Sequence, residues 1–196
     1  MKQRKAKVQR TTRETDIRVD LNLDGDGRSR IDTGLPFFNH MLELLSKHSL
    51  IDLALTAKGD LDVDAHHTVE DIGITLGGAL DRALGDRKGI FRYGWSYVPM
   101  DDALRRVAID LGGRPYLVFE AANRRRKVGG FDVTLIPEFL QAFSVQGRLN
   151  LHAAQLYGRD PHHAYESLFK ALARALRMAC APDARVSGVP SSKGTL

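Results

Sequence analysis

Hydrophobic and polar positions alternate near the start of the chain, which predicts strands. Apolar side chains stand at about every second position over residues 6–24, and the Asp-Gly-Asp-Gly sequence at 24–27 is a turn signal. Residues 50–57 alternate in the same way, with Ile51, Leu53, Leu55 and Ala57 on one side. Between these segments, residues 36–45 predict a helix that has proline near its start.

Apolar residues recur every three or four positions in two longer segments, which predicts amphipathic helices. The first segment is 66–84, where Gly85 follows, and the second is 162–179. The elements expected between them are strands within 104–120 around a turn at 112–115, a helix at 134–145 and a short strand at 148–157.

The two halves of the chain share a repeated sequence. Residues 64–70 read Asp-Ala-His-His-Thr-Val-Glu, and residues 160–166, at an offset of 96, read Asp-Pro-His-His-Ala-Tyr-Glu. Two copies at such an offset indicate a duplication. We therefore expect an α+β fold of internally duplicated half-domains, each a mostly antiparallel sheet packed by helices. The first half-domain would span 1–93 and the second 94–196, with one HH-x-x-E copy in each.

Length, cysteine content and hydropathy narrow the class of protein. The 196 residues suffice to bury a core without a disulfide or a metal ion. Cys180 is the single cysteine, so no intrachain disulfide exists and a reducing, cytoplasmic compartment is expected. No apolar run approaches about 18 residues, so we expect no membrane partner. The basic N-terminus precedes no apolar stretch and predicts no secretory signal.

The basic excess of the chain is modest, with a net charge of +5 and a pI of about 9.5. Such a balance fits nucleic acid, an anionic small substrate or simple solubility. Because the basic residues are spread along the chain, we expect no nucleic-acid partner. The exception is a run that we interpret as a solvated surface or turn: Arg124, Arg125, Arg126 and Lys127.

Four of the seven histidines lie in the HH-x-x-E copies, at the start of the predicted helices. Glu70 lies three and four residues after His67 and His66, so either pair presents a nitrogen and an oxygen on one face. Neighbouring helical side chains point about 100° apart, so one HH pair does not place both rings on one ion. We therefore expect two ions, each with one histidine from each copy. The same geometry recurs at His162, His163 and Glu166.

The ligand types indicate the kind of metal. Imidazole with carboxylate suits Mn, Fe, Co or Zn rather than Ca or Mg, and the lack of a cysteine cluster argues against structural zinc. His40 precedes His66 by 26 residues and Glu138 precedes His162 by 24, which makes them candidate equivalent ligands. His48 and His152 are interpreted as structural. The competing interpretation is that the paired histidines only bond solvent and backbone at helix ends.

Motifs along the whole chain carry a family resemblance. They are Arg10-x-Thr12-x-Glu14-Thr15, Thr33-Gly34-x-x-Phe37-Phe38-x-His40-Met41-Leu42, Gly59-Asp60-Leu61-x-Val63-Asp64-x-His66-His67-Thr68-x-Glu70-Asp71, Gly89-Ile90-x-Arg92-Tyr93-Gly94, Pro99-Met100-Asp101-Asp102-Ala103-Leu104, Asp110-x-x-Gly113-Arg114-Pro115-Tyr116, Gly158-x-x-x-His162-His163-x-x-Glu166-Ser167 and Pro190-Ser191-Ser192-Lys193-Gly194. With these motifs the chain resembles the imidazoleglycerol-phosphate dehydratase family. It departs at Asp160, where the family usually has Asn, and at Glu138, where many members have His.

The resemblance implies a lyase of histidine biosynthesis that converts D-erythro-imidazoleglycerol phosphate to imidazole acetol phosphate and water. It also implies two Mn²⁺ ions per active site and a homo-oligomer of 24 subunits with sites shared between subunits. The phosphatase domain fused to some relatives is expected to be absent. The implied metal ligands are His40, His66, His67, Glu70, Glu138, His162, His163 and Glu166.

The dehydration needs a proton-transfer group, and the phosphate needs cations and amides. Glu14 is the first candidate for acid–base catalysis and Asp101 the second. The C-terminal residues 190–196 offer hydroxyls, an ammonium and a glycine, a set suited to an oxyanion, so we expect them to order over the phosphate. The candidate substrate-binding residues are Glu14, Arg92, Arg114, Lys170, Ser192 and Lys193.

Two other functions compete with the dehydratase. A dinuclear metallohydrolase would use the same ions to activate water and would release inorganic phosphate from a phosphate ester. A metal-storing or structural shell would bind exchangeable metal without turnover. Conversion of imidazoleglycerol phosphate to a ketone, with and without Mn²⁺, separates the three.

Overall fold

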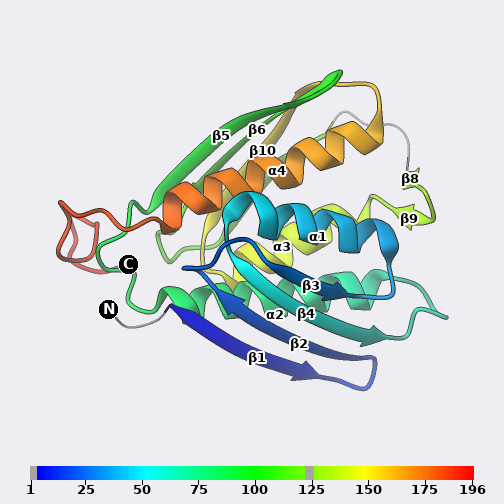
Figure 1. The fold of residues 1–196 in the computed structure, drawn as a ribbon, viewed down its shortest axis with the longest axis horizontal. Helices are drawn as coiled ribbons and strands as arrows, with labels where there is room; N and C mark the ends of the chain where they lie inside the picture. Colours follow the sequence, from blue (N-terminus) through cyan, green and yellow to red (C-terminus); the bar gives the residue numbers. More distant parts are fainter. Residues whose placement is uncertain (1–3, 122–125) are drawn as a thin grey trace.

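The computed structural model describes residues 4–121 and 126–196 and has an α+β fold (Figure 1). Within these residues the chain forms four helices, two four-stranded sheets and a two-stranded ribbon. In chain order the elements are β1 (Lys5–Thr11), β2 (Thr15–Asn22), β3 (Ser29–Asp32), α1 (Pro36–Ser49), β4 (Asp52–Gly59), α2 (His66–Leu84), β5 (Tyr93–Met100), β6 (Ala103–Asp110), β7 (Tyr116–Glu120), β8 (Lys127–Val128), β9 (Phe131–Asp132), α3 (Leu135–Gln146), β10 (Asn150–Tyr157) and α4 (Pro161–Cys180).

The two four-stranded sheets have the same topology. Their strand orders are β1-β2-β4-β3 and β5-β6-β10-β7. In each sheet the first three strands pair antiparallel and the last strand, β3 or β7, pairs parallel. In each half a helix precedes the third strand of the sheet and another follows it. The expected α+β fold of duplicated, mostly antiparallel halves is therefore confirmed, whereas the boundary between residues 93 and 94 stays a prediction.

The helices join the two halves. Helix α2 packs on the first sheet and α4 on the second, but α1 of the first half packs against α4, and α3 of the second half packs against α2. Aromatic rings from three helices meet between the halves: Phe139 lies 5.2 Å from Phe38 and 5.9 Å from Phe169, between ring centroids. The halves therefore share one hydrophobic core.

Two glycines explain the close approach of α2 and α3. A Cβ placed on Gly73 would lie 2.6 Å from the carbonyl oxygen of Phe139, and one on Gly77 would lie 2.6 Å from that of Phe143. Both contacts are with backbone atoms, which cannot move aside as a flexible side chain does. Glycine at these positions lets the helices touch, although it lowers intrinsic helix propensity.

Most elements lie close to their predicted ranges, and α2 coincides with the predicted 66–84. The strand pattern over 6–24 is divided between β1 and β2, which form a hairpin whose turn the sequence analysis did not predict. The turn lacks glycine and proline, and the hydroxyl of Thr12 instead accepts the backbone N–H groups of Glu14 and Thr15 at 3.1 and 3.0 Å. Strand β5 was not predicted, because aromatic side chains on its outer face hide the alternation: Tyr93, Trp95 and Tyr97.

Two further findings concern the basic run at 124–127 and the suitability of the helices for crossing a membrane. Of the basic run, Arg124 and Arg125 lie outside the described residues, and Arg126 and Lys127 are exposed. No helix in the described part of the chain has the length and apolar character needed to cross a membrane.

Candidate functional site

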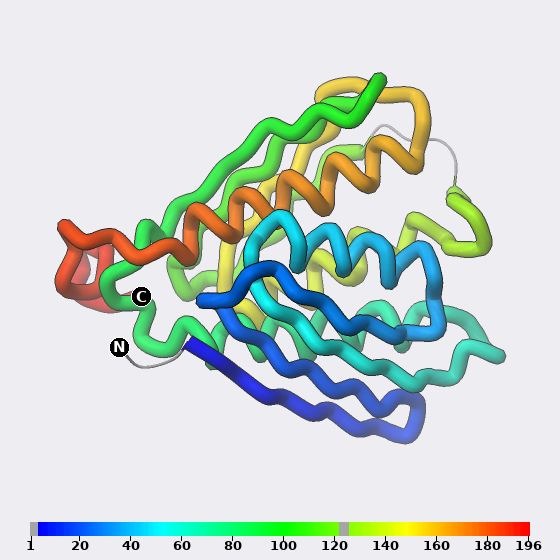
Figure 2. The backbone as a smooth tube through the Cα atoms, in the orientation of Figure 1, coloured from blue at the N-terminus to red at the C-terminus, as the bar shows by residue number. Residues whose placement is uncertain are grey.

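All four helices of the described residues begin at the same end of the molecule, and the start of β1 and the C-terminus lie at the opposite end (Figures 1 and 2). The residues just before α4 and α2 favour the start of a helix at these positions. Pro161 occupies the first turn of α4, and the carboxylate of Asp160 accepts the backbone N–H groups of His162 and His163 at 2.7 and 3.3 Å. Asp64 accepts the N–H of His66 at 2.7 Å in the same way. Both HH pairs are thus placed at this common end.

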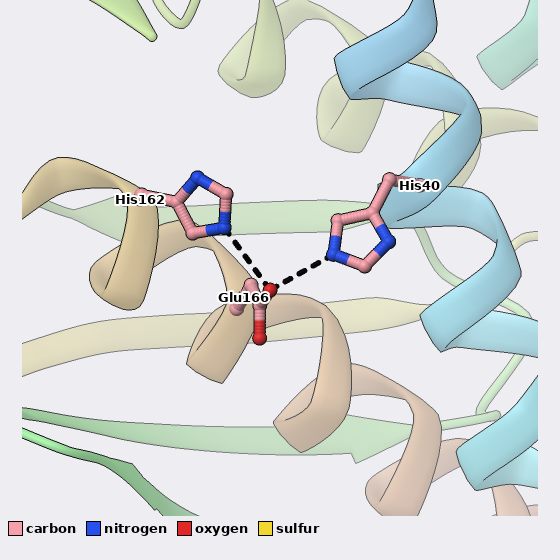
Figure 3. A group of neighbouring side chains, drawn as sticks. All are labelled: His40, His162 and Glu166. Carbon is pink, nitrogen blue, oxygen red and sulfur yellow. Dashed lines mark hydrogen bonds and ion pairs between the residues drawn. The ribbon is translucent and has the colours of Figure 1, made fainter.

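Three of the predicted ligands form a compact group. Their ligand atoms all lie within 4.8 Å of one another, with His40 on α1 and with His162 and Glu166 on α4 (Figure 3). Oε1 of Glu166 lies 2.8 Å from Nε2 of His40 and 3.1 Å from Nε2 of His162. Two imidazole nitrogens and a carboxylate are a donor set that Mn, Fe, Co and Zn accept. The residues present therefore fit a transition-metal ion.

Glu166 is buried and strongly hydrogen-bonded. Burial alone would raise the pKa of its carboxyl group, but the hydrogen bonds with His40, Lys170 and His162 outweigh burial and lower the pKa to about 2. Nζ of Lys170 lies 2.7 Å from Oε2 of Glu166. Lys170 therefore faces the metal group, one helical turn beyond the carboxylate.

The repeat-equivalent ligands are less closely gathered. Nε2 of His66 lies 3.8 Å from Oε2 of Glu70, and Glu138 is in the first turn of α3, the helix that packs on α2. Among the residues that the structure describes, the 4.8 Å grouping is found for His40, His162 and Glu166 alone. The equivalence of His40 and Glu138 therefore stays a prediction.

The second histidine of each pair points away from the first. The ring planes of His66 and His67 meet at 87°, and the ring centroids are 6.1 Å apart. The rings of His162 and His163 repeat this arrangement, with an angle of 87° between the planes and 6.3 Å between the centroids. This is the geometry expected of neighbouring helical residues. One pair therefore does not chelate one ion with both rings.

His67 and His163 each have a carboxylate partner that the sequence analysis did not identify. Nδ1 of His67 lies 2.9 Å from Asp60, and Nδ1 of His163 lies 2.8 Å from Asp102. These hydrogen bonds raise the pKa of both imidazoles. A carboxylate at Nδ1 fixes the ring and leaves Nε2 for a metal ion. Both aspartates stood inside recognised motifs, but their spacing from the histidines, 7 and 61 residues, gave no signal.

The acid–base candidates lie beside these same histidines. Oε2 of Glu14 is 3.8 Å from Nδ1 of His67, and Oδ2 of Asp101 is 3.3 Å from Nε2 of His163. Asp101 has a φ of 45° in the two-residue turn between β5 and β6, a turn that requires positive φ. One acid–base candidate therefore accompanies each HH copy.

The phosphate-binding candidates other than Lys170 lie at the opposite end of the molecule from the metal group. Arg92 donates to Asp110 at 2.6 Å and to the carbonyl of Pro190 at 2.7 Å, which anchors the C-terminal segment that carries Ser192 and Lys193. A Cβ on Gly113 would lie 2.7 Å from the carboxyl carbon of Leu196, so this segment folds onto the turn that contains Arg114. Figure 1 shows the segment beyond the C-terminal end of α4, whereas the metal group lies at the N-terminal end.

Fold and site together define an internally duplicated α+β protein with a candidate transition-metal centre. The family model described as imidazoleglycerol-phosphate dehydratase matches residues 33–176. The chain belongs to the imidazoleglycerol-phosphate dehydratase family, as its motifs indicated.

Named relatives and solved structures agree with this assignment. The chain is 55% identical to the imidazoleglycerol-phosphate dehydratase of Thioalkalivibrio sulfidiphilus over all of both chains. It is 56% identical to that of Acidithiobacillus ferrooxidans, over 100% of this chain and 99% of the relative. The crystal structure of the Staphylococcus aureus dehydratase superposes with a TM-score of 0.83 at 40% identity and covers 91% of this chain and 99% of its own. The Pyrococcus furiosus structure gives 0.83 at 38%, over 96% and 100%.

Proposed function

We propose that this chain converts D-erythro-imidazoleglycerol phosphate to imidazole acetol phosphate and water, as a carbon–oxygen hydro-lyase of histidine biosynthesis. The observation that carries the proposal is the grouping of His40, His162 and Glu166 in a chain of the imidazoleglycerol-phosphate dehydratase family. The curated relatives bear the name of this activity over the full length of the chain.

The proposal includes two Mn²⁺ ions in each active site. His40, His162 and Glu166 would hold one ion, and Glu138, His66 and Glu70 would hold the other. When bound, the ions supply Lewis acidity that favours the deprotonated imidazole ring of the substrate. His67 and His163, which point away from their neighbours, would each complete a site in another subunit. Each ion then has one histidine from each HH copy, as the sequence suggested.

The side chains of the protein supply proton transfer and phosphate binding. Glu14 accepts the proton from the carbon next to the one that loses its hydroxyl group, and the hydroxyl leaves as water after it gains a proton. Asp101 is the second candidate for the acid–base group that accepts the proton from this carbon. The enol that results becomes the ketone. The phosphate would be bound by Lys170, Arg92, Arg114, Ser192 and Lys193.

We further propose a homo-oligomer of 24 subunits with shared active sites, located in the cytoplasm. Two observations support sharing. The C-terminal segment lies far from the metal group of its own chain: α4, which separates them, has 20 residues and so spans about 30 Å. In addition, Tyr93, Trp95 and Tyr97 form a row of exposed aromatic side chains along β5, the kind of surface that marks a protein interface.

The test is an assay of the purified chain with imidazoleglycerol phosphate, before and after removal of metal and after addition of Mn²⁺. Metal-dependent formation of the ketone supports the dehydratase. Release of inorganic phosphate would instead indicate a metallohydrolase, and metal binding without turnover would indicate a storage or structural role. Light scattering on the same sample measures the oligomeric state.

A further inference from the structure

A polar network joins the tip of the β1–β2 hairpin to helix α2. The carboxylate of Asp71 accepts Nε–H of Arg10 at 2.9 Å with one oxygen and the hydroxyl of Thr15 at 2.5 Å with the other. Both Asp71 and Thr15 are buried, at 7% and 4% exposure. Oγ1 of Thr12 lies 3.2 Å from Oγ1 of Thr15 and accepts the backbone N–H of Glu14. The network therefore fixes both the turn and its attachment to the helix.

Each end of this network is adjacent to a residue of the candidate site. Thr15 directly follows Glu14, and Asp71 directly follows Glu70 on the turn after His67. The side chain of Glu14 is 53% exposed, and its Oε2 lies 3.8 Å from Nδ1 of His67. Because half of the Glu14 side chain is exposed to solvent, packing alone does not fix it. Its position therefore depends on the residues that hold the backbone of the hairpin tip.

The second half of the chain shows that the fold does not require this network. The residue equivalent to Asp71 at the repeat offset is Ser167, whose hydroxyl bonds the carbonyl of Ala164 in its own helix. The residue equivalent to Thr15 is Ala103, because each is the first residue of the second hairpin strand, β2 or β6, directly after the turn. Alanine has no hydroxyl that could bond Ser167.

The second half therefore packs a hairpin on a helix with a serine where the first half has Asp71. The carboxylate network belongs to the half that carries Glu14. At the second hairpin tip the carboxylate of Asp102 instead accepts the backbone N–H groups of Arg159 and Asp160, so each tip is fixed in its own way beside its acid–base candidate, Glu14 or Asp101.

We propose that Asp71 and Thr15 are positioning residues for the dehydration. They hold Glu14 against His67 and do not touch the substrate themselves. The inference rests on the proposed function, because it concerns the proton transfer assigned to Glu14. A displacement of a catalytic group by about 1 Å can lower a rate about 10²-fold, so a buried anchor one residue away matters for turnover.

The experiment compares Thr15→Val with Thr15→Ser. Valine has the shape of threonine but no hydroxyl, so the bond to Asp71 is lost, whereas serine retains it. We expect Thr15→Val to lower kcat about 10- to 100-fold, with bound metal unchanged and KM within about threefold of the wild type. Thr15→Ser should stay within about threefold in kcat. Should Thr15→Val not fold, Asp71→Asn provides the same comparison, since it removes the charge from the network and keeps its shape.

Two controls separate positioning from a general loss of structure. Thr75→Val removes another buried hydroxyl on α2, one that bonds the backbone carbonyl of Asp71 at 2.7 Å, and it should leave kcat unchanged. In the background of Glu14→Gln, Thr15→Val should cause no further loss, because the network acts through Glu14. A wild-type kcat in Thr15→Val, or a further loss in the double variant, overturns the inference. A wild-type chain without dehydratase activity would overturn the proposed function itself, and this inference with it.

Discussion

Nε2 of His40 lies 2.8 Å from Oε1 of Glu166, although the two residues are 126 positions apart and belong to different halves of the chain. The contact exists because α1 of the first half packs on α4 of the second. A metal group built across the halves cannot form until both halves have folded together. Metal binding at this group should therefore stabilise the whole chain rather than one half.

The proposed two-copy site is tested by removal of the histidines that point outward. His67→Ala and His163→Ala should each abolish dehydration and lower the amount of bound metal, because each change removes a ligand that the other copy cannot replace. Metal content after dialysis and ketone formation are the measurements. His48→Ala, in the last turn of α1, should keep its metal. Full activity with normal metal content in either outward-histidine variant contradicts the two-copy site.

Glu14→Gln tests the assignment of the acid–base group. Glutamine has nearly the size of glutamate but cannot accept the proton, so metal and substrate should still bind while kcat falls about 10²- to 10⁴-fold. Asp101→Asn, measured beside it, shows the contribution of the carboxylate at the second HH copy. If Glu14→Gln turns over within a few-fold of the wild type, the proton transfer belongs to another residue.

Deletion of residues 191–196 tests the role of the C-terminal segment. This segment is anchored at the carbonyl of Pro190 by Arg92, which the deletion leaves in place. We expect a large rise in KM with unchanged metal content, because the deletion removes hydroxyls, an ammonium and backbone amides that would bind the phosphate. The loss should be smaller for a substrate analogue without the phosphate. Normal handling of the phosphorylated substrate would show that the segment has no part in binding.

Asp52 should make the stability of the chain depend on pH. Its carboxylate accepts the side chain of Arg28 at 2.9 Å and two backbone N–H groups, and the arginine hydrogen bond in particular holds the pKa of Asp52 well below its usual range. A carboxyl group whose pKa is lower in the folded state stabilises the fold above its unfolded pKa of about 3.9, and the contribution is lost as pH falls further.

Asp52→Ala should therefore lower the free energy of unfolding by about 1–2 kcal/mol at pH 7 and by less below pH 4. The urea midpoint at the two pH values measures this. Asp26→Ala is the matched control, since Asp26 pairs with the same arginine at 3.6 Å but has an 82% exposed side chain, and exposed pairs contribute little. An Asp52→Ala effect that is the same at both pH values contradicts the linkage.

The sequence predicted those parts of the molecule that depend on local periodicity or on the repeat. Helix α2 was predicted over its full length because apolar residues face one side, and the HH-x-x-E copies indicated two similar halves. Strand β5 was missed because its exposed face is aromatic rather than polar. The partnership of His163 with Asp102 was missed because it depends on how β6 and α4 pack, which no spacing of 61 residues encodes.

The exchange of short helices between the halves bears on the origin of the chain. Each long helix, α2 or α4, packs against the short helix of the other half, α3 or α1. An ancestor with one half alone would have had no partner for that helix face within a single polypeptide, and two identical copies would have supplied it to each other. The present arrangement is the one that fusion of the genes for such a homodimer would produce. Fusion would leave the two former copies free to diverge, and one short helix now carries His40 while the other carries Glu138.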